Sequence, residues 1–391
     1  MGKSGVRRSI VADLTGASRL AIEAVTGVTE LVEAVHMKVL NQAIGTPAVR
    51  PVAAVTSLVY RSVKGATRLV GGGLDAVLGR LAPALAEPAA WSGREALLAA
   101  LNGVLGDRLV ASGNSLAITM RFRQRGQPLR VDAPSARVLV LAHGLCMNDV
   151  QWTRDGVDHG ATLACERGYT AVYLHYNSGR HISENGREFA QQLQALVDGW
   201  AVPVTELVII GHSMGGLLAR SACHYGVQAG HGWTGLLSKL VFLGTPHHGA
   251  PLERGGNWVH LLTDLSAYSA PFSRLAKIRS AGITDLRHGS VLDDDWDGLD
   301  RFAHGAPLPQ LVPLPAGVRC FAIAATVGKK EGDLKDRLLA GDGLVPLASA
   351  LGQHSDPERC LSFDQSEVLL QTNHMQLLSS TAVSARLLAW L

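Results

Sequence analysis

The chain has 391 residues, of which 47 % are hydrophobic and 18 % are charged, so it is long enough for one large domain with an appendage or for two ordinary domains. That composition excludes global disorder, and a net charge of +3 with 5 % aromatic residues gives no basis for nucleic-acid binding. The five cysteines are scattered and contain no C-x-x-C pair, which argues against a disulfide framework and a zinc site. We therefore expect a reduced, cytoplasmic protein with no metal, while its oligomeric state stays open.

Residues 1–112 are predicted to form a helical N-terminal region. Apolar residues recur at three- and four-residue spacings over 18–40, and similar stretches follow over 52–81 and 91–110. The last of these begins at a candidate capping serine, Ser92, with Glu95 three residues later. Charged or polar residues interrupt the apolar stretches, so we expect neither a signal peptide nor a membrane span.

Two interpretations of this region stay open. Residues 1–80 contain ten Lys and Arg against five Asp and Glu, which with the apolar stripe favours peripheral association with a membrane or lipid granule. The alternative is a small helical subdomain that packs on the rest of the chain or on another copy, because Glu23, Glu30 and Glu33 dilute the basic face.

From about residue 113 the pattern changes to short apolar strands that alternate with helices. An antiparallel pair over 115–123 and 127–132 opens the region, and further strands are expected over 137–144, 170–177, 206–211, 238–244 and 318–325. A helix over 183–200 begins at a capping serine, Ser183, and an amphipathic helix closes the chain over 374–391. This order predicts an α/β fold with a mostly parallel sheet that is covered on both faces, occupying residues 113–391.

The segment from about 252 to 316 interrupts this alternation. It is long and irregular, which is typical of a lid or cap inserted into an α/β domain. Its apolar side chains could line an acyl pocket or form ordinary core under a lid; they include Trp258, Leu261, Leu262, Leu265 and Phe272.

A single serine stands where an apolar strand gives way to a helix. Gly211-His212-Ser213-Met214-Gly215 is a G-x-S-x-G sequence, with the strand ELVII before it and a helical pattern after it. This context predicts a nucleophile elbow, in which a tight turn exposes the serine hydroxyl and leaves no room for side chains two residues away. The simpler alternative is a serine that only caps the helix.

A serine nucleophile needs an imidazole base and a carboxylate that orients it, and in this fold they follow in the order serine, acid, histidine. Asp342 lies between two glycines after the strand 318–325, and His374 precedes the final helical stretch. We weighed other candidates for these roles, the acidic cluster at 293–300 and the histidines His247, His248 and His354, and found their positions less suitable.

An oxyanion hole requires two backbone donors near the serine. We expect one from the amide of Met214 and the other from Leu145, which follows His143-Gly144 at the end of the strand 137–144. His143 and His212 adjoin these positions and are candidate substrate-binding residues, together with Trp258, Leu261 and Leu262. Cys146 is expected to be a small buried residue.

Five segments in order resemble the lipase and esterase branch of the α/β-hydrolase superfamily: LVLAHGL, VIIGHSMGGLLAR, LVFLGTPHHGAP, GDGLVP and TNHMQLL. The GTPHHGAP segment is similar to a loop of bacterial lipases and of enzymes that deacylate GPI-anchor inositol. The resemblance covers about residues 136–391. It implies the triad Ser213, Asp342 and His374, oxyanion donors at Leu145 and Met214, and no cofactor.

The function expected from these observations is hydrolysis of carboxylic esters, with a small-molecule or lipid ester as the substrate. Acyl transfer or amide cleavage would use the same triad, and a hydrolase fold that only binds or scaffolds a partner is a third alternative. The natural substrate and its acyl chain length stay open.

Overall fold

The computed structural model describes residues 94–250, 280–298, 308–331 and 341–391. In chain order, the helices and strands of these residues are α3 (Arg94–Ala111), β1 (Arg121–Gln124), β2 (Gln127–Pro128), β3 (Arg137–Ala142), β4 (Thr153–Arg154), β5 (Val157–Asp158), α4 (His159–Arg167), β6 (Thr170–His175), α5 (Ile182–Asp198), β7 (Glu206–His212), α6 (Met214–Gln228), β8 (Leu237–Leu243), α8 (Ala281–His288), β9 (Arg319–Thr326), α10 (Leu347–Ala350), β10 (Gln365–Leu370) and α11 (Thr381–Trp390). Short 3₁₀ turns complete the set: η1 (Asp149–Trp152), η2 (Gly232–Gly235), η4 (Asp293–Asp295), η5 (Pro357–Arg359) and η6 (His374–Leu378).

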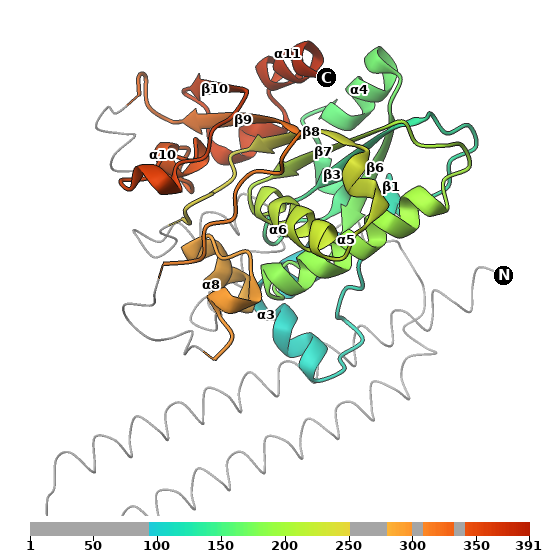
Figure 1. Ribbon diagram of the computed structural model, residues 1–391, viewed down its shortest axis with the longest axis horizontal. Helices are drawn as coiled ribbons and strands as arrows, with labels where there is room; N and C mark the ends of the chain where they lie inside the picture. The colour runs from blue at the N-terminus through green and yellow to red at the C-terminus, as the bar shows by residue number, and fades with distance from the viewer. Residues whose placement is uncertain (1–93, 251–279, 299–307, 332–340) are drawn as a thin grey trace, which may run out of the picture. The chain divides into compact units, whose positions relative to one another are not determined.

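The described residues form an eight-stranded sheet in the order β10-β9-β8-β7-β3-β6-β1-β2 (Figure 1). The six strands from β10 to β6 run parallel, whereas β1 pairs antiparallel with β6 and with β2. The central strands β3 and β7 are almost wholly buried, which explains why their sequences are continuous apolar runs rather than alternating ones. The predicted α/β fold with a mostly parallel sheet and an opening antiparallel pair is confirmed.

Helices cover both faces of the sheet (Figure 1). On one face, α5 and α6 pack against each other and bury Phe189 and Leu218 with strand residues such as Val140 and Ile209. On the other face α4 contacts α11, and Trp390 of α11 stacks on Phe321 of β9 with ring centroids 5.0 Å apart. This three-layer core holds the carboxyl ends of the parallel strands at one edge.

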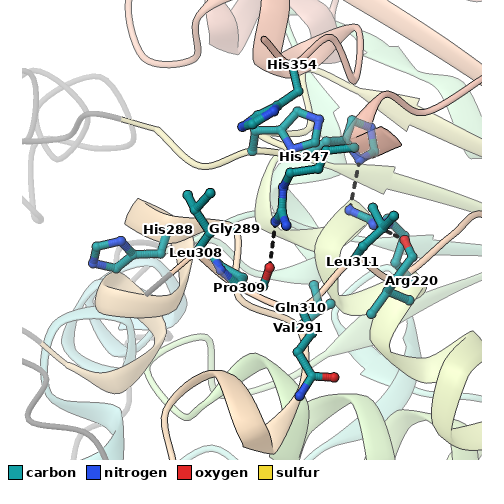
Figure 2. Close-up of a pocket in the computed structure, with 13 residues that line it drawn as sticks. Arg220, His247, His288, Gly289, Val291, Leu308, Pro309, Gln310, Leu311 and His354 are labelled. Carbon is teal, nitrogen blue, oxygen red and sulfur yellow. Dashed lines mark hydrogen bonds between the residues drawn. The ribbon is translucent and has the colours of Figure 1, made fainter. Parts of the chain in front are cut away.

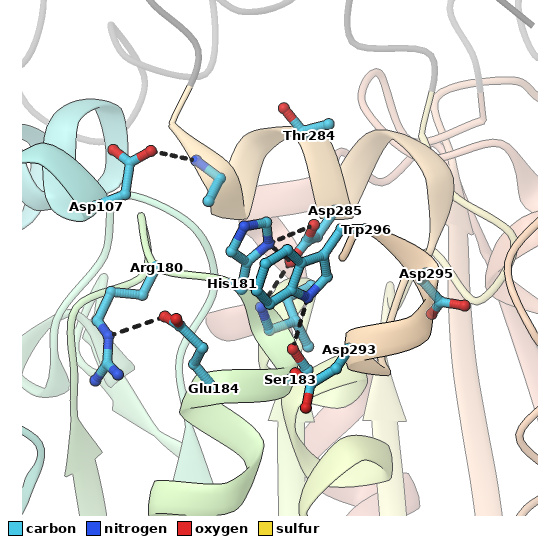
Figure 3. A network of polar contacts seen from close by, with 12 residues as sticks. Asp107, Arg180, His181, Ser183, Glu184, Thr284, Asp285, Asp293, Asp295 and Trp296 are labelled. Atoms are coloured by element: carbon cyan, nitrogen blue, oxygen red, sulfur yellow. Dashed lines mark hydrogen bonds and ion pairs between the residues drawn. The ribbon is translucent and has the colours of Figure 1, made fainter. Parts of the chain in front are cut away.

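The start of α5 differs from the sequence prediction. Ser183 does not cap the helix: the N-cap is His181, whose side chain makes no capping hydrogen bond. Instead Asp285 of α8 accepts from the backbone N–H of Ile182 at 2.7 Å, and the Ser183 hydroxyl accepts from the indole of Trp296 at 2.9 Å (Figure 3). The prediction was wrong because a carboxylate distant in sequence supplies the cap.

The closing helix is also shorter than predicted. Residues 374–378 form the 3₁₀ turn η6, and α11 begins only at Thr381. Asn373 caps η6 by accepting from the N–H of Gln376 at 2.9 Å. The apolar periodicity had predicted one helix over 374–391, whereas in the structure a side-chain cap forms a separate turn before α11.

Helix α3 packs closely on the loops that follow β3 and β6. Asn177 donates to the carbonyl of Gly106 at 3.0 Å, and Ser280 donates to the carbonyl of Gly103 at 2.7 Å. A Cβ atom on Gly103 would lie 2.2 Å from the sulfur of Cys146, so glycine permits this close approach. The division of the chain at residue 112 stays a prediction, since residues 1–93 lie outside the described residues, but residues 94–111 contact the sheet domain.

The predicted lid falls partly outside the described residues. Residues 251–279 and 299–307 are not described, and the described remainder contains α8 and η4. The lid therefore stays a prediction.

Candidate active site

Ser213 occupies the sharp turn between β7 and α6. Its φ of 54° and ψ of −124° lie in a region that non-glycine residues rarely adopt. The turn is held by the Ser213 N–H, which donates to Leu243 O at 2.8 Å, and by the Gly216 N–H, which donates to Ser213 O at 3.1 Å. The strand, turn and helix expected of a nucleophile elbow are therefore all present.

The glycines around Ser213 are required by backbone contacts. A Cβ atom on Gly211 would lie 2.5 Å from the Cα of Gly216, and one on Gly215 would lie 2.1 Å from the carbonyl oxygen of Ala142 in β3. Both neighbours are main-chain atoms that cannot move aside without shifting a buried strand or helix. The G-x-S-x-G spacing thus has a direct steric cause in this fold.

We predict that Gly215→Ala destabilises the protein. Alanine favours a helix over glycine by up to about 1 kcal/mol, but the clash with Ala142 O should exceed that gain and leave a net loss of about 2 kcal/mol. Urea denaturation measures the difference in the free energy of unfolding. Gly235→Ala is the matched control: no atom lies within 4 Å of its added Cβ, and its φ is not positive, so stability should change by less than about 0.5 kcal/mol. Equal stability of Gly215→Ala and wild type would contradict the steric argument.

Asp342 and His374 form a buried pair at the same edge of the sheet. His374 Nδ1 donates to Asp342 Oδ2 at 2.7 Å, and the His374 N–H donates to the Asp342 carbonyl at 3.0 Å. The other carboxylate oxygen accepts from the amides of Leu344 and Val345 at 3.0 and 2.8 Å. Because a carboxylate only accepts, the proton of the neutral ring resides on Nδ1 and Nε2 keeps its lone pair.

Three loops that follow parallel strands bring these residues together. Ser213 follows β7, Asp342 lies beyond β9, and His374 comes shortly after β10. Ser213 and His374 line one narrow cavity of about 10 Å³, whose other lining residues are Gly144, Leu145, Met147, His212, Ala250, Leu286, Leu344, Val345 and Met375. Carboxyl ends of parallel strands are where ligands bind in open α/β sheets.

The loop after β3 lies directly against the turn at Ser213. A Cβ atom on Gly144 would stand 3.0 Å from the Cβ of Ser213, and the next residue, Leu145, lines the cavity. Met214 is the first residue of α6, where the helix dipole is positive. Within the described part of the chain, neither the Leu145 nor the Met214 amide donates a hydrogen bond to another residue. Both amides are thus available to a negatively charged oxygen beside Ser213.

The two candidate substrate-binding histidines have different positions. His143 is fully buried and does not line the cavity; its ring stacks on Tyr176 at a centroid distance of 4.4 Å, and burial lowers its pKa to about 3. His212 lines the cavity, and its Nε2 lies 3.3 Å from the carbonyl of His374, to which it donates. Burial lowers the pKa of His212 well below its usual value, so its ring is neutral. His212 therefore supports the backbone of His374.

The remaining sequence candidates lie elsewhere. Trp258, Leu261 and Leu262 are outside the described residues. His247, His248 and His354 line a separate cavity. In the acidic cluster, Asp293 forms an ion pair with Arg187 and Asp295 accepts from the amides of Val291 and Leu292. Cys146 is buried, which raises the pKa of its thiol to about 12.

Several cavity residues carried no sequence signal of their own. Met147, Leu286 and Met375 are apolar side chains from three distant segments that meet only in the folded chain. A sequence pattern could not distinguish them from core residues. The hydrogen bond from His212 to the His374 carbonyl could not be predicted from the sequence either, although His212 was a candidate because it lies within the G-x-S-x-G motif.

Residues 139–320 match the sequence family described as the PGAP1-like alpha/beta domain. The matched residues begin within β3, include β7 and the turn at Ser213, and extend into β9. Over these residues the described domain is similar to that family. The resemblance to the lipase and esterase branch that the five motifs indicated is confirmed.

Solved structures similar to the described domain include lipases and esterases, and no curated protein matches the sequence. The mature Bacillus licheniformis lipase BlEst2 is 18 % identical, with 69 % of this chain and 98 % of the lipase covered at a TM-score of 0.42. An ester hydrolase from the metagenome of Lake Arreo is 16 % identical, with 69 % and 79 % covered at a TM-score of 0.39. An esterase from Pyrococcus furiosus is 13 % identical, with 69 % and 83 % covered at a TM-score of 0.37.

None of the described helices combines the length and hydropathy needed to cross a bilayer. No group of three or more His, Cys, Asp or Glu side chains in the described ranges is placed to hold a metal ion.

Proposed function

We propose that the protein is a serine ester hydrolase in which Ser213 is the nucleophile, His374 the general base and Asp342 the residue that orients His374. The observation that carries the proposal is the buried hydrogen bond of 2.7 Å between His374 and Asp342, at a cavity that Ser213 also lines. A neutral histidine fixed through Nδ1 is the arrangement that accepts a proton from a serine hydroxyl.

In the first half of the reaction the Ser213 hydroxyl attacks the carbonyl carbon of the ester. Its proton passes to Nε2 of His374, and the carbonyl oxygen becomes an oxyanion that the amides of Leu145 and Met214 hold by hydrogen bonds. The buried carboxylate of Asp342 stabilises the imidazolium that forms. When the tetrahedral intermediate collapses, the alcohol leaves with the proton from His374 and Ser213 remains acylated.

In the second half a water molecule replaces the alcohol. His374 takes a proton from the water, which attacks the acyl carbon, and the same two amides hold the second oxyanion. Collapse returns the proton to Ser213 and releases the carboxylic acid. Each step uses the pair Asp342 and His374 in the same orientation, so no rearrangement of the triad is needed.

The test is covalent labelling combined with a substrate series. Wild-type protein should react with a fluorophosphonate on Ser213, identified by mass spectrometry of the modified peptide, and should hydrolyse p-nitrophenyl esters. Measuring esters of two to sixteen carbons with and without a lipid emulsion defines the acyl preference. No labelling and no turnover by folded protein would contradict the proposal and favour a binding or scaffolding role.

Product analysis separates the enzymatic alternatives. With an added alcohol, release of free acid supports hydrolysis, whereas formation of a new ester identifies an acyltransferase. Turnover of an anilide that exceeds turnover of the matching ester would identify an amidase. Adding liposomes to the assay also tests the proposed lipid association of residues 1–112, because anionic vesicles should sediment the full-length chain at low salt.

A further inference from the structure

A second cavity lies apart from the ester site, beside α6 and η5 (Figure 2). It has a free volume of about 40 Å³, more than the roughly 10–15 Å³ that one water molecule needs. Two arginines and four histidines line it together with apolar residues. These arginines and histidines are Arg220, Arg359, His247, His248, His288 and His354. Among the described residues, no acidic side chain lines it.

Arg220 is the central feature of this cavity. It comes from α6 and is only 4 % exposed, yet no carboxylate forms an ion pair with it in the described part of the chain. Its Nη2 donates to the carbonyl of Val312, and its Nη1 lies 3.5 Å from Nδ1 of His247. Its buried Nε–H has no hydrogen-bond partner among the described residues. Burial lowers its pKa to about 10, so the guanidinium stays charged near neutral pH.

A second buried arginine of the described residues, Arg123, differs from Arg220 because carboxylates neutralise its charge. Arg123 is 7 % exposed and forms ion pairs with Glu95 at 2.8 Å and Asp149 at 3.1 Å. A buried charge without such a partner costs several kcal/mol. Within the described ranges, Asp295 is the one carboxylate that raises the pKa of Arg220, and its two oxygens already accept from backbone amides.

A second guanidinium faces the same space. Arg359 donates through Nη2 to the carbonyl of Pro309 at 2.5 Å. In the part of the chain that the structure describes, neither the buried Nε–H of Arg359 nor the buried Nε2 of His247 has a hydrogen-bond partner. Since His247 Nδ1 is the acceptor toward Arg220, its Nε2 carries the proton. The unpartnered groups around the cavity are therefore all donors.

We propose that this cavity binds a phosphate group. Two guanidiniums with free Nε–H donors match the tetrahedral oxygens of phosphate, which accept hydrogen bonds and supply the missing negative charge. The volume admits a small group rather than an entire lipid. A neighbouring cavity of about 380 Å³ shares His248 and His288 with it, so a substituent on the phosphate has room to extend. This site does not depend on the function proposed for Ser213.

Isothermal titration calorimetry of the full-length protein with inorganic phosphate and with glycerol 3-phosphate tests the site. We expect saturable binding of at least one of them, at least tenfold weaker in Arg220→Gln and in Arg359→Gln. Arg386→Gln is the matched control, because it removes one positive charge from an exposed position on α11 and should bind as wild type does. Tighter binding of glycerol 3-phosphate identifies a phosphate monoester such as a headgroup, and tighter binding of inorganic phosphate identifies the free ion.

Thermal melting in 10 mM phosphate against chloride of equal ionic strength gives a second readout. Wild type and Arg386→Gln should gain about 2–4 °C more than Arg359→Gln, and the comparison cancels the general stabilisation that phosphate salts give. Arg359 is only half-buried, so its variant keeps the test valid if Arg220→Gln does not fold. The proposal is overturned if folded wild-type protein shows no saturable binding heat in the calorimetric titration with either phosphate compound. It is also overturned if Arg359→Gln binds phosphate as wild type does.

Discussion

Ser213→Ala is expected to lower kcat for p-nitrophenyl butyrate by about 10⁵- to 10⁶-fold and to abolish fluorophosphonate labelling. The reason is that the substitution removes the atom that forms the acyl-enzyme while leaving the cavity and the oxyanion donors in place. Removing the nucleophile of a triad removes nearly all of the rate enhancement that the acyl-enzyme pathway provides, because the histidine and aspartate then have no hydroxyl to activate. Initial rates at saturating substrate measure kcat, and gel fluorescence measures labelling.

A matched control separates lost chemistry from lost structure. Ser366→Ala removes another serine hydroxyl at an exposed position on β10, so its rate and labelling should equal those of wild type. The circular dichroism spectrum and melting temperature of Ser213→Ala should also be retained or improved, since alanine does not add atoms to the strained turn. A Ser213→Ala protein that keeps its rate or its label would remove Ser213 from the mechanism.

Asp342→Asn is expected to lower kcat by about 10⁴-fold, for a reason that the hydrogen bonds around Asp342 specify. Its Oδ1 accepts from the amides of Leu344 and Val345, so the asparagine carbonyl oxygen should stay on that side. The asparagine NH₂ would then face His374 and donate to Nδ1. That places the ring proton on Nε2, where the lone pair that accepts the serine proton is needed.

The same kinetic assay measures this effect, with the melting temperature as the check on folding. Asp155→Asn is the control, because Asp155 is exposed and its nearest cation, Arg154, is 3.8 Å away. If Asp342→Asn retains more than a tenth of the wild-type kcat, another carboxylate orients the base or His374 is not the base.

The elbow and the strands around it could be predicted because their causes are local. Glycines at 211 and 215 and an apolar run before Ser213 report a steric requirement that lies within a few residues of the serine. Asp342 lies between glycines with φ of 68° and 98°, so the turn that holds it is also indicated by its immediate neighbours in the sequence. Such positions can be identified from one sequence.

Other features depend on residues that are distant along the chain. The cap of α5 comes from Asp285, and no local pattern links residue 285 to residue 182. The edge strand β10 lacks a buried apolar run, since its residues are half-buried or exposed, so it was not predicted. The sequence did not distinguish Arg220 from other residues of a helix. It became a candidate binding residue only because the structure buries it without a carboxylate partner in the described residues.

The fixation of His374 has a further consequence. Asp342, on the loop after β9, binds its ring and its N–H, and His212, the last residue of β7, binds its carbonyl. In the mechanism proposed here the proton acceptor is in position before any ester arrives. Changes to the apolar side chains that admit the acyl group should therefore alter which esters are used while leaving the chemistry common to all of them intact, and selectivity could diversify on this scaffold without rebuilding its proton transfer.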